Sequence, residues 1–328
     1  MKKIIPIILL IMLPLLLQTG CTEIEDSGPA DGALTETTET APPSYPVTAE
    51  GLVFADSPAT AASLSPAVTE MIFELGYGDR LVCRSSYCDY PGEALELPEA
   101  GSGANPDINR IIELSPELVI TQSPLANTDL SALKNAGIAI LDLPSPENPE
   151  QLCENYRTLG MIFAGETMGV QLADSCTAPL KSALRSANGS CSSLVFIMEV
   201  TEQGYLTAAE GSFAGSYISE FGSNALPSGT GYLLTSDELI AADPQVIFLA
   251  KPLSSERIPQ EVRDRLSAFS SGYVYVIDSS LIQRPTSRLA GVTRSISEKL
   301  REDTGAVPFT EGYAVIESTA DMTGDRLT

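Results

Sequence analysis

The stretch that organises this chain is residues 148–187, which read NPEQLCENYRTLGMIFAGETMGVQLADSCTAPLKSALRSA. Asn148 is a favourable helix N-cap, Pro149 suits the first helical position, and Gln151 is placed to complete a capping box. Gly165 can end this helix in a left-handed conformation. The apolar residues between these limits recur at helical spacing: Leu152, Tyr156, Leu159 and Phe163.

A second helical stripe follows directly and ends at Asn188-Gly189. Its members lie four residues apart: Met168, Leu172, Cys176, Leu180 and Leu184. Two helices in series, with no strand between them, predict a stiff strut that joins the parts of the chain on either side. Pro179 lies inside the second stripe and lacks a backbone donor, so a kink or a restart is predicted there.

On either side of this strut, short apolar runs alternate with helical patterns. Such alternation predicts an α/β fold with mostly parallel sheets, here two Rossmann-like lobes bridged by a long helix. The domains we assign are an N-terminal lobe at 51–147, a helical connector at 148–190, a C-terminal lobe at 191–305 and a polar tail at 306–328. The predicted strands are 61–64, 81–83, 118–121, 138–141, 194–200, 246–249 and 273–277, and the predicted helices include 107–114, 237–242, 259–269 and 285–301.

An internal repeat supports the two-lobe organisation. Residues 111–120 read IIELSPELVI, and residues 239–248 read LIAADPQVIF. Each copy predicts a short helix, a proline that ends it and a buried strand. One copy falls in each predicted lobe.

The N-terminal residues are typical of an exported protein. Two lysines follow Met1, residues 4–17 are apolar, and Gly20-Cys21 comes next. The apolar run is too short for an ordinary membrane span and indicates a secretory signal. The junction before Cys21 resembles a bacterial lipoprotein cleavage site, at which the cysteine is acylated, although Gln18 departs from that pattern. We assign residues 1–21 to a lipoprotein signal peptide, the alternative being a signal with an incidental cysteine. Residues 22–50, which contain no basic side chain, are assigned to a disordered acidic linker.

Composition excludes several classes of function. The chain carries 19 basic and 43 acidic residues, a formal charge of −24, which argues against a nucleic-acid partner. It contains no histidine, so Ser-His and Cys-His catalytic pairs and imidazole metal sites are excluded. Besides Cys21, the cysteines are Cys83, Cys88, Cys153, Cys176 and Cys191, of which the first two are close enough in sequence to bridge. No resident cofactor or metal site is predicted, and the chain is not expected to be an enzyme.

Three blocks carry a resemblance to a known family: residues 63–70 (SLSPAVTE), 74–82 (ELGYGDRLV) and 86–91 (SYCDYP). The chain resembles the helical-strut (class III) solute-binding proteins of bacterial metal-chelate importers over about residues 61–303. Block 86–91 is most similar to cobalamin-binding members. The resemblance implies two α/β lobes bridged by one long helix, with a ligand held between them. It also implies delivery of an iron-siderophore, haem or cobalamin to an ABC permease and its ATPase.

The ligand is expected beyond the carboxyl ends of the strands, as in other open α/β sheets. Aromatic faces with a few polar anchors suit flat, partly apolar ligands. The candidate ligand-binding residues are Arg84, Tyr87, Tyr90, Tyr205, Tyr232 and Arg284. Tyr87 and Tyr90 lie in a polar loop that ends at a proline, which favours the pocket, whereas a core position suits Tyr205 and Tyr232 equally well. Arg288 is expected to cap or pair locally on the last helix.

The resemblance also implies an acidic residue on each lobe that meets arginines of the permease. The matching position lies seven residues before the proline of each repeat, which is Asp237 in the second lobe, beside Glu238, and Asn109 in the first. Because Asn109 is not acidic, Asp107 or Glu113 is an alternative, as is asymmetric docking. The alternative explanation of Asp237 and Glu238 is the preference of acidic side chains for a helix N-terminus.

Together these observations predict a lipid-anchored receptor on the extracytoplasmic face of the cell membrane. Its cargo would be a metal chelate, either a corrinoid such as cobalamin or an iron-siderophore. A receptor for a non-metal solute and a structural or adhesive envelope lipoprotein with the same fold are the alternatives. An enzyme is disfavoured because no nucleophile-base pair or phosphate-binding loop occurs.

Overall fold

The computed structural model describes residues 44–209, 211–226, 232–302 and 314–316. The predicted signal peptide, Cys21 and residues 22–43 of the predicted linker lie outside these described residues. The end of that linker is ordered structure instead, because β1 (Val47–Ala49) pairs antiparallel with β2 (Leu52–Phe54). Val47 and Ala49 are buried, and their burial explains why the assigned linker boundary at residue 50 is wrong.

The N-terminal lobe contains a four-stranded sheet in the order β4-β3-β7-β8, and every neighbouring pair is parallel. Its strands are β3 (Ala61–Ser63), β4 (Leu81–Cys83), β7 (Leu118–Thr121) and β8 (Ala139–Asp142). Its helices are α1 (Pro66–Glu74), α2 (Ile108–Leu114) and α3 (Asn127–Asn135). A small hairpin, β5 (Gly101–Ser102) with β6 (Asn105–Pro106), leads into α2. The continuous apolar runs of these strands fit a parallel sheet that is covered on both faces.

The C-terminal lobe contains a mixed sheet in the order β12-β10-β9-β13-β14-β15, with β11 beside β9. Its parallel strands are β9 (Ser193–Thr201), β11 (Ser223–Asn224), β13 (Val246–Ala250), β14 (Val274–Ile277) and β15 (Ala314–Ile316). The antiparallel edge is β10 (Gly204–Thr207) and β12 (Leu233–Leu234). The helices are α6 (Phe213–Ser219), α7 (Ser236–Ala242), α8 (Gln260–Arg263), α9 (Ser267–Ser271), α10 (Ser280–Gln283) and α11 (Leu289–Glu302).

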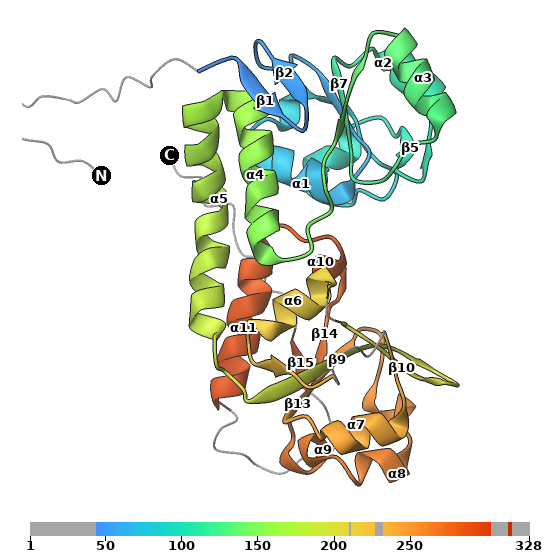
Figure 1. Ribbon diagram of the computed structural model, residues 1–328, viewed down its shortest axis with the longest axis vertical. Helices are drawn as coiled ribbons and strands as arrows, with labels where there is room; N and C mark the ends of the chain where they lie inside the picture. The colour runs from blue at the N-terminus through green and yellow to red at the C-terminus, as the bar shows by residue number, and fades with distance from the viewer. Residues whose placement is uncertain (1–43, 210, 227–231, 303–313, 317–328) are drawn as a thin grey trace, which may run out of the picture. The chain divides into compact units, whose positions relative to one another are not determined.

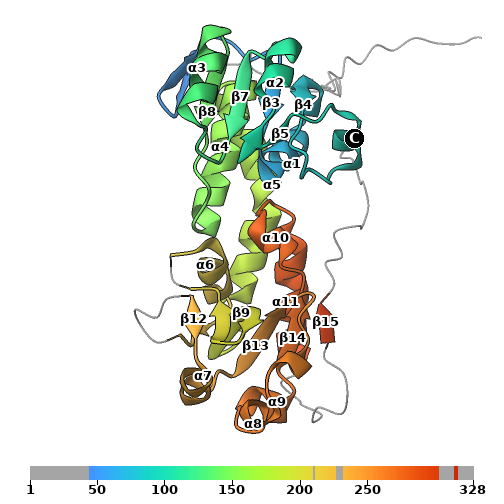
Figure 2. The ribbon, with the colours of Figure 1, turned by 90° about the vertical axis from the view of Figure 1, so that its right-hand side faces the viewer.

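Three features of this lobe differ from the predicted elements. The helix predicted at 259–269 is divided into α8 and α9, the antiparallel edge was not predicted, and β15 lies within the predicted tail. Figure 2 shows the two sheets on either side of α10. The two copies of the sequence repeat adopt the same structure, since Ser115 and Asp243 both have positive φ, 49° and 35°, directly before their prolines.

The predicted connector consists of α4 (Pro149–Ala164) and α5 (Glu166–Ala187), which lie side by side (Figure 1). Gly165 has φ 78° and ψ 167°, a region outside the left-handed helix that glycine alone reaches easily, and there the chain reverses. The two helices are therefore a hairpin rather than a strut in series. Helix α5 passes along both lobes, against α4 in one and α11 in the other (Figure 1), which confirms the predicted bridging helix.

The hairpin also explains why the buried face of α5 is not the predicted stripe. Its first half buries the small residues Gly169, Ala173 and Thr177 instead of Met168, Leu172 and Cys176. A Cβ at Gly169 would lie 2.3 Å from the backbone of Gly160, so the helices meet backbone to backbone. Pro179 is exposed and α5 continues through it, so the helix does not restart there.

Candidate functional site

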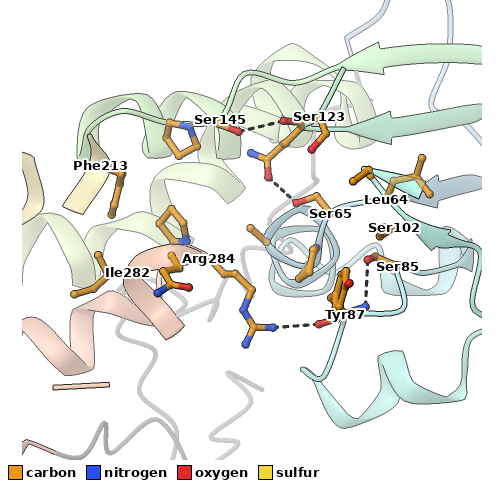
Figure 3. Close-up of a pocket in the computed structure, with 18 residues that line it drawn as sticks. Leu64, Ser65, Ser85, Tyr87, Ser102, Ser123, Ser145, Phe213, Ile282 and Arg284 are labelled. Carbon is orange, nitrogen blue, oxygen red and sulfur yellow. Dashed lines mark hydrogen bonds between the residues drawn. The ribbon is translucent and has the colours of Figure 1, made fainter. Parts of the chain in front are cut away.

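A cleft of about 450 Å³ lies between the two lobes at the carboxyl ends of the strands. Segments that follow β3, β4, β7 and β8, together with the β5–β6 hairpin, form its N-terminal wall. Residues of α6, of α10 and of the segment after α10 form the other wall (Figure 3). Its lining residues are Leu64, Ser65, Pro66, Ala67, Ser85, Tyr87, Ser102, Gly103, Ala104, Gln122, Ser123, Ser145, Pro146, Phe213, Ile282, Gln283, Arg284 and Pro285. We call it the ligand cleft. Its position at the strand ends is the position expected for the site.

The lining of the ligand cleft is polar but almost uncharged. Arg284 is the single charged residue among the lining residues, which otherwise offer five serines and two glutamines beside apolar groups. The Ser65 hydroxyl donates to the Gln122 side-chain oxygen at 2.6 Å, and the Ser145 hydroxyl donates to the Gln122 carbonyl at 3.2 Å (Figure 3). The bond from Ser65, with the donation of the Gln122 side-chain nitrogen to the Pro144 carbonyl at 3.4 Å, fixes the orientation of the side-chain amide. The cleft thus presents hydroxyl and amide groups that can pair with neutral carbonyl and amide groups of a ligand.

Arg284 ties the two walls of the ligand cleft together. It follows α10, and its guanidinium donates to both carboxylate oxygens of Asp89 at 2.9 and 3.2 Å. One of its nitrogens also donates to the Tyr87 carbonyl at 3.1 Å (Figure 3). The Tyr87 side chain is 70% exposed on the cleft wall. The structure therefore brings Tyr87 and Arg284, two of the predicted ligand-binding residues, to one site.

A second, smaller cleft of about 260 Å³ shares Arg284 with the first. Its lining is strongly charged and includes Glu70, Asp89, Tyr90, Asp278, Ser280, Leu281, Arg284 and Arg288. The Arg288 guanidinium carbon lies 3.7 Å from the centre of the Tyr90 ring, and one of its nitrogens lies 3.2 Å from the Glu70 carboxylate. Arg288 thus pairs across the lobes rather than locally on its helix. Tyr90 lines this charged cleft and is not among the residues of the ligand cleft.

Behind the charged cleft, three consecutive residues of the C-terminal lobe bind carboxylates of α1. The Thr286 hydroxyl donates to Glu70 at 3.3 Å, and Arg288 pairs with the same oxygen. The Ser287 hydroxyl donates to Glu74 at 2.8 Å, and the Ser287 amide donates to the Tyr156 hydroxyl at 2.8 Å. Tyr156 in turn donates a short hydrogen bond to Glu74. We call these contacts the inner junction.

Of the two carboxylates in the inner junction, Glu70 is buried and Glu74 is partly buried. Glu70 is 2% exposed, and burial raises the pKa of both Glu70 and Glu74, although Arg288 opposes the shift. Burial and the neighbouring Glu74 carboxylate also raise the pKa of Tyr156 well above its usual value. Sequence reasoning did not single out this cluster. Its one signal was a pair of glutamates four residues apart on a mainly apolar helix, which places both on one face.

Comparison with known proteins decides the family. Residues 62–281, about two-thirds of the chain, match the model of the family described as periplasmic binding protein. The chain belongs to this family. The vitamin B12-binding protein of Vibrio cholerae serotype O1 is 26% identical over 245 residues, which are 73% of this chain and 88% of that protein. The uncharacterized ABC transporter substrate-binding lipoprotein YvrC of Bacillus subtilis is 26% identical over 325 residues, 93% of this chain and 99% of that one.

Solved structures of periplasmic binding proteins share the fold. The vitamin B12-binding protein BtuF of Vibrio cholerae has a TM-score of 0.62 at 23% identity, covering 75% of this chain and 98% of that one. The apo form of the heme-binding protein RhuT from Roseiflexus sp. RS-1 has a TM-score of 0.60 at 20% identity, covering 75% and 99%. The predicted two-lobe α/β architecture is therefore confirmed.

Besides Tyr90, three predicted ligand-binding residues of this periplasmic binding protein lie away from the ligand cleft. Arg84 is 7% exposed, donates to the carbonyls of Ser85 and Cys88, and pairs with Glu99 at 3.1 Å, so it holds its own loop together. Tyr205 is 2% exposed in the core of the C-terminal lobe. Tyr232 is 58% exposed but lines neither of the two clefts.

The candidate docking residues lie at the surface. Asp237 and Glu238 are exposed in the first turn of α7, and Asn109 is exposed on α2. Glu238 completes a capping box: its carboxylate accepts from the Thr235 amide at 2.8 Å, which lowers the pKa of Glu238. Asp107 likewise accepts from the Arg110 amide at 3.0 Å as the N-cap of α2. Asp237 has no such capping role in the structure.

The cysteines and helices of the described residues add three findings. The five cysteines are free, and Cys88 donates to the Thr69 hydroxyl at 3.1 Å, so Cys83 and Cys88 do not bridge. No group of three acidic or cysteine side chains among these residues is arranged to hold a metal ion. None of their helices is both long and apolar enough to cross a membrane.

Proposed function

We propose that this chain is the substrate-binding component of an ABC importer and that its cargo is a corrinoid. The observation that carries the proposal is the lining of the ligand cleft, whose one charged side chain is already paired with Asp89. A corrinoid ring carries peripheral amides that match serine and glutamine side chains. Haem and many ferric siderophores bring carboxylates or other anionic groups, which a cleft without a free cation binds poorly.

The size of the cleft and the nature of the relatives support this cargo. The volume of the cleft, about 450 Å³, lies within the range typical of clefts that bind small molecules. Tyr87 and Phe213 supply aromatic surface at opposite walls. The Vibrio cholerae relative is named as a vitamin B12-binding protein, and YvrC as an ABC transporter substrate-binding lipoprotein.

Calorimetric titration of the purified protein with cyanocobalamin, haemin and ferric enterobactin, an anionic siderophore complex, tests the proposal. We expect saturable binding of cyanocobalamin and weaker binding of the other two. Tyr87→Ala should weaken corrinoid binding by roughly 1–3 kcal/mol, the range for losing one buried aromatic contact. Tyr232→Ala is the matched control, because Tyr232 is also exposed but lines neither cleft. Tight binding of a ferric siderophore with no response to cyanocobalamin would reject the corrinoid.

Docking to the permease is proposed to use Asp237, with Glu238 and Asn109 at the matching surface positions. Glu238 makes the capping hydrogen bonds with Thr235, so Asp237 is the carboxylate with fewer local hydrogen bonds. Asp237→Lys should abolish uptake and preserve ligand binding, because reversing an interface charge typically costs several kcal/mol. Glu261→Lys on α8 is the control and should transport normally. Normal uptake by Asp237→Lys would exclude this surface as the permease-docking site. Uptake that depends on the wild-type protein would itself distinguish an importer receptor from an adhesive lipoprotein.

We further propose that Cys21 carries a lipid anchor, which would hold the protein on the extracytoplasmic face of the membrane. Cys21 lies directly after Gly20 at the end of the apolar leader. Cys21→Ser should release the protein from the membrane fraction or block its processing. A processed variant that stays in the membrane fraction would contradict the anchor. No catalytic activity and no resident cofactor are proposed.

A further inference from the structure

Asp89 lies on the loop after β4, in the N-terminal lobe, and faces Arg284 from the C-terminal lobe. Its two carboxylate oxygens accept two parallel hydrogen bonds from the guanidinium, at 2.9 and 3.2 Å. This bidentate arrangement gives two charge-assisted hydrogen bonds, which are stronger than hydrogen bonds between neutral groups. Asp89 belongs to the lining of the charged cleft, whereas Arg284 lines both clefts. Asp89 therefore contacts the one cation of the ligand cleft from outside that cleft.

The pair cancels the charge of Arg284 without using all of its donors. A guanidinium carries five N–H groups. In the described part of the chain, the contacts with Asp89 and the Tyr87 carbonyl use three of them. Two N–H groups remain to meet a ligand. A donor pair whose positive charge is already balanced suits a neutral carbonyl oxygen better than a carboxylate.

A second carboxylate strengthens this balance. Asp278 lines the charged cleft together with Arg284, and its pKa is lowered by its hydrogen bonds with Ser280 and, less strongly, by the charges of Lys251 and Arg284. An anionic ligand group near Arg284 would therefore approach the carboxylates of Asp89 and Asp278 as well as the guanidinium, and Lys251 offsets part of the charge of Asp278. It would have to displace Asp89 or accept that repulsion.

We propose that Asp89 is a specificity-determining residue, which neutralises Arg284 so that the ligand cleft selects amide-bearing over carboxylate-bearing ligands. This inference rests on the proposed function, since it assumes that the cleft binds a tetrapyrrole. It predicts that, of two ligands with the same shape, the cleft binds the one with a neutral amide more tightly than the one with a carboxylate.

The test compares matched ligands. Cyanocobalamin is titrated beside its monocarboxylic acids, in each of which one peripheral amide has been hydrolysed to a carboxylate. The full-length protein is compared with Asp89→Asn, Asp89→Glu, Arg284→Gln and the double variant Asp89→Asn/Arg284→Gln. Glu93→Gln is the control, because Glu93 is an exposed carboxylate nearby in the chain with no contact to Arg284 among the described interactions.

The measured quantity is the ratio of the affinities for acid and amide. Asp89→Asn should raise this ratio about 10-fold for at least one acid, because an unpaired guanidinium forms a strong charge-assisted bond with it. Asp89→Glu should keep the wild-type ratio, and the double variant should return close to it. A change below about twofold in Asp89→Asn, or an equal change in Glu93→Gln, would overturn the proposal.

The same design separates this inference from the proposed function. If the wild-type protein binds cyanocobalamin and Asp89→Asn leaves the ratio unchanged, the inference alone fails. If it binds haemin and no corrinoid, the proposed cargo fails, and the ratio is then measured with haemin and its dimethyl ester, where an unchanged ratio again overturns the role of Asp89. If it binds no tetrapyrrole at all, both are overturned.

Discussion

The stretch from Arg284 to Arg288 contacts the N-terminal lobe at two places that differ in burial. At the outer contact, the Arg284 and Asp89 side chains are 31% and 65% exposed. At the inner junction, the Arg288 and Glu70 side chains are 21% and 3% exposed, and the bonds to Glu74 and Tyr156 lie beside them. Both contacts hold an arginine against a carboxylate of the other lobe, so burial is the main difference between them.

Because they differ in burial, the outer contact and the inner junction should play different roles. Exposed ion pairs contribute little to stability because water and salt screen them, so the outer contact can change when a ligand arrives. A buried carboxylate is costly when it loses its partner, so the inner junction resists any movement that would separate its groups. We infer that the inner junction sets the relation between the lobes and the outer contact sets which ligands the cleft accepts.

Replacing each arginine by methionine should give the largest contrast. Arg288→Met leaves Glu70 buried without its cation, and we expect the free energy of unfolding to fall by about 3 kcal/mol. Arg284→Met leaves only the exposed Asp89 unpaired and should cost less than about 1 kcal/mol. Urea unfolding of both variants at pH 7.5 measures this. Equal losses would show that burial does not distinguish the two contacts.

The pH dependence of stability should come from the inner junction. Burial raises the folded-state pKa of Glu74 above its ordinary value of 4.5, so the folded protein holds this proton more tightly than the unfolded chain. The stability from the bound proton is fully present below the unfolded pKa and is lost as pH rises through the folded pKa. Glu74→Gln keeps an acceptor for Tyr156 and Ser287 but cannot ionise.

We therefore expect Glu74→Gln to be more stable than wild type at pH 7.5, by on the order of 1 kcal/mol, and no more stable near pH 4. Urea unfolding across this range measures the difference between the two proteins. Asp89→Asn is the control, since Asp89 belongs to the exposed contact and should show no comparable gain at neutral pH. A Glu74→Gln variant that is less stable than wild type at pH 7.5 would contradict the burial argument.

Local chemistry made much of the fold predictable. Asn148 caps α4 as expected, accepting from the Gln151 amide at 2.9 Å, although the Gln151 side chain reaches back to the Glu147 amide instead of to Asn148. The two repeat copies, with their prolines, were found from residue order alone. These features depend on neighbours a few residues away, which the sequence displays directly.

The misplaced residues depend on partners far away in the chain. The reversal at Gly165 brings Gly169 against Gly160, and that contact turns the buried face of α5 away from the predicted stripe. Arg84 and Tyr205 are types that often line clefts, yet packing buries both of them. Likewise, the residues near Arg288 in sequence do not indicate that it pairs with Glu70, which precedes it by more than two hundred residues. Side-chain type suggested the candidates, and long-range packing determines which of them line the clefts.

Replacing Tyr90 gives the smallest expected change in stability and tests whether Tyr90 belongs with Arg288 rather than with the ligand cleft. It was predicted to bind ligand, but its ring lies under the Arg288 guanidinium, 3.7 Å away. Tyr90→Leu keeps apolar bulk and removes the cation–π attraction, so unfolding should become easier by about 0.5 kcal/mol. In the Arg288→Met background the same change should cost nothing further, which a double-mutant cycle measures. Corrinoid affinity should stay at the wild-type value, in contrast with Tyr87→Ala. A Tyr90→Leu protein of normal stability and reduced affinity would return Tyr90 to the ligand cleft.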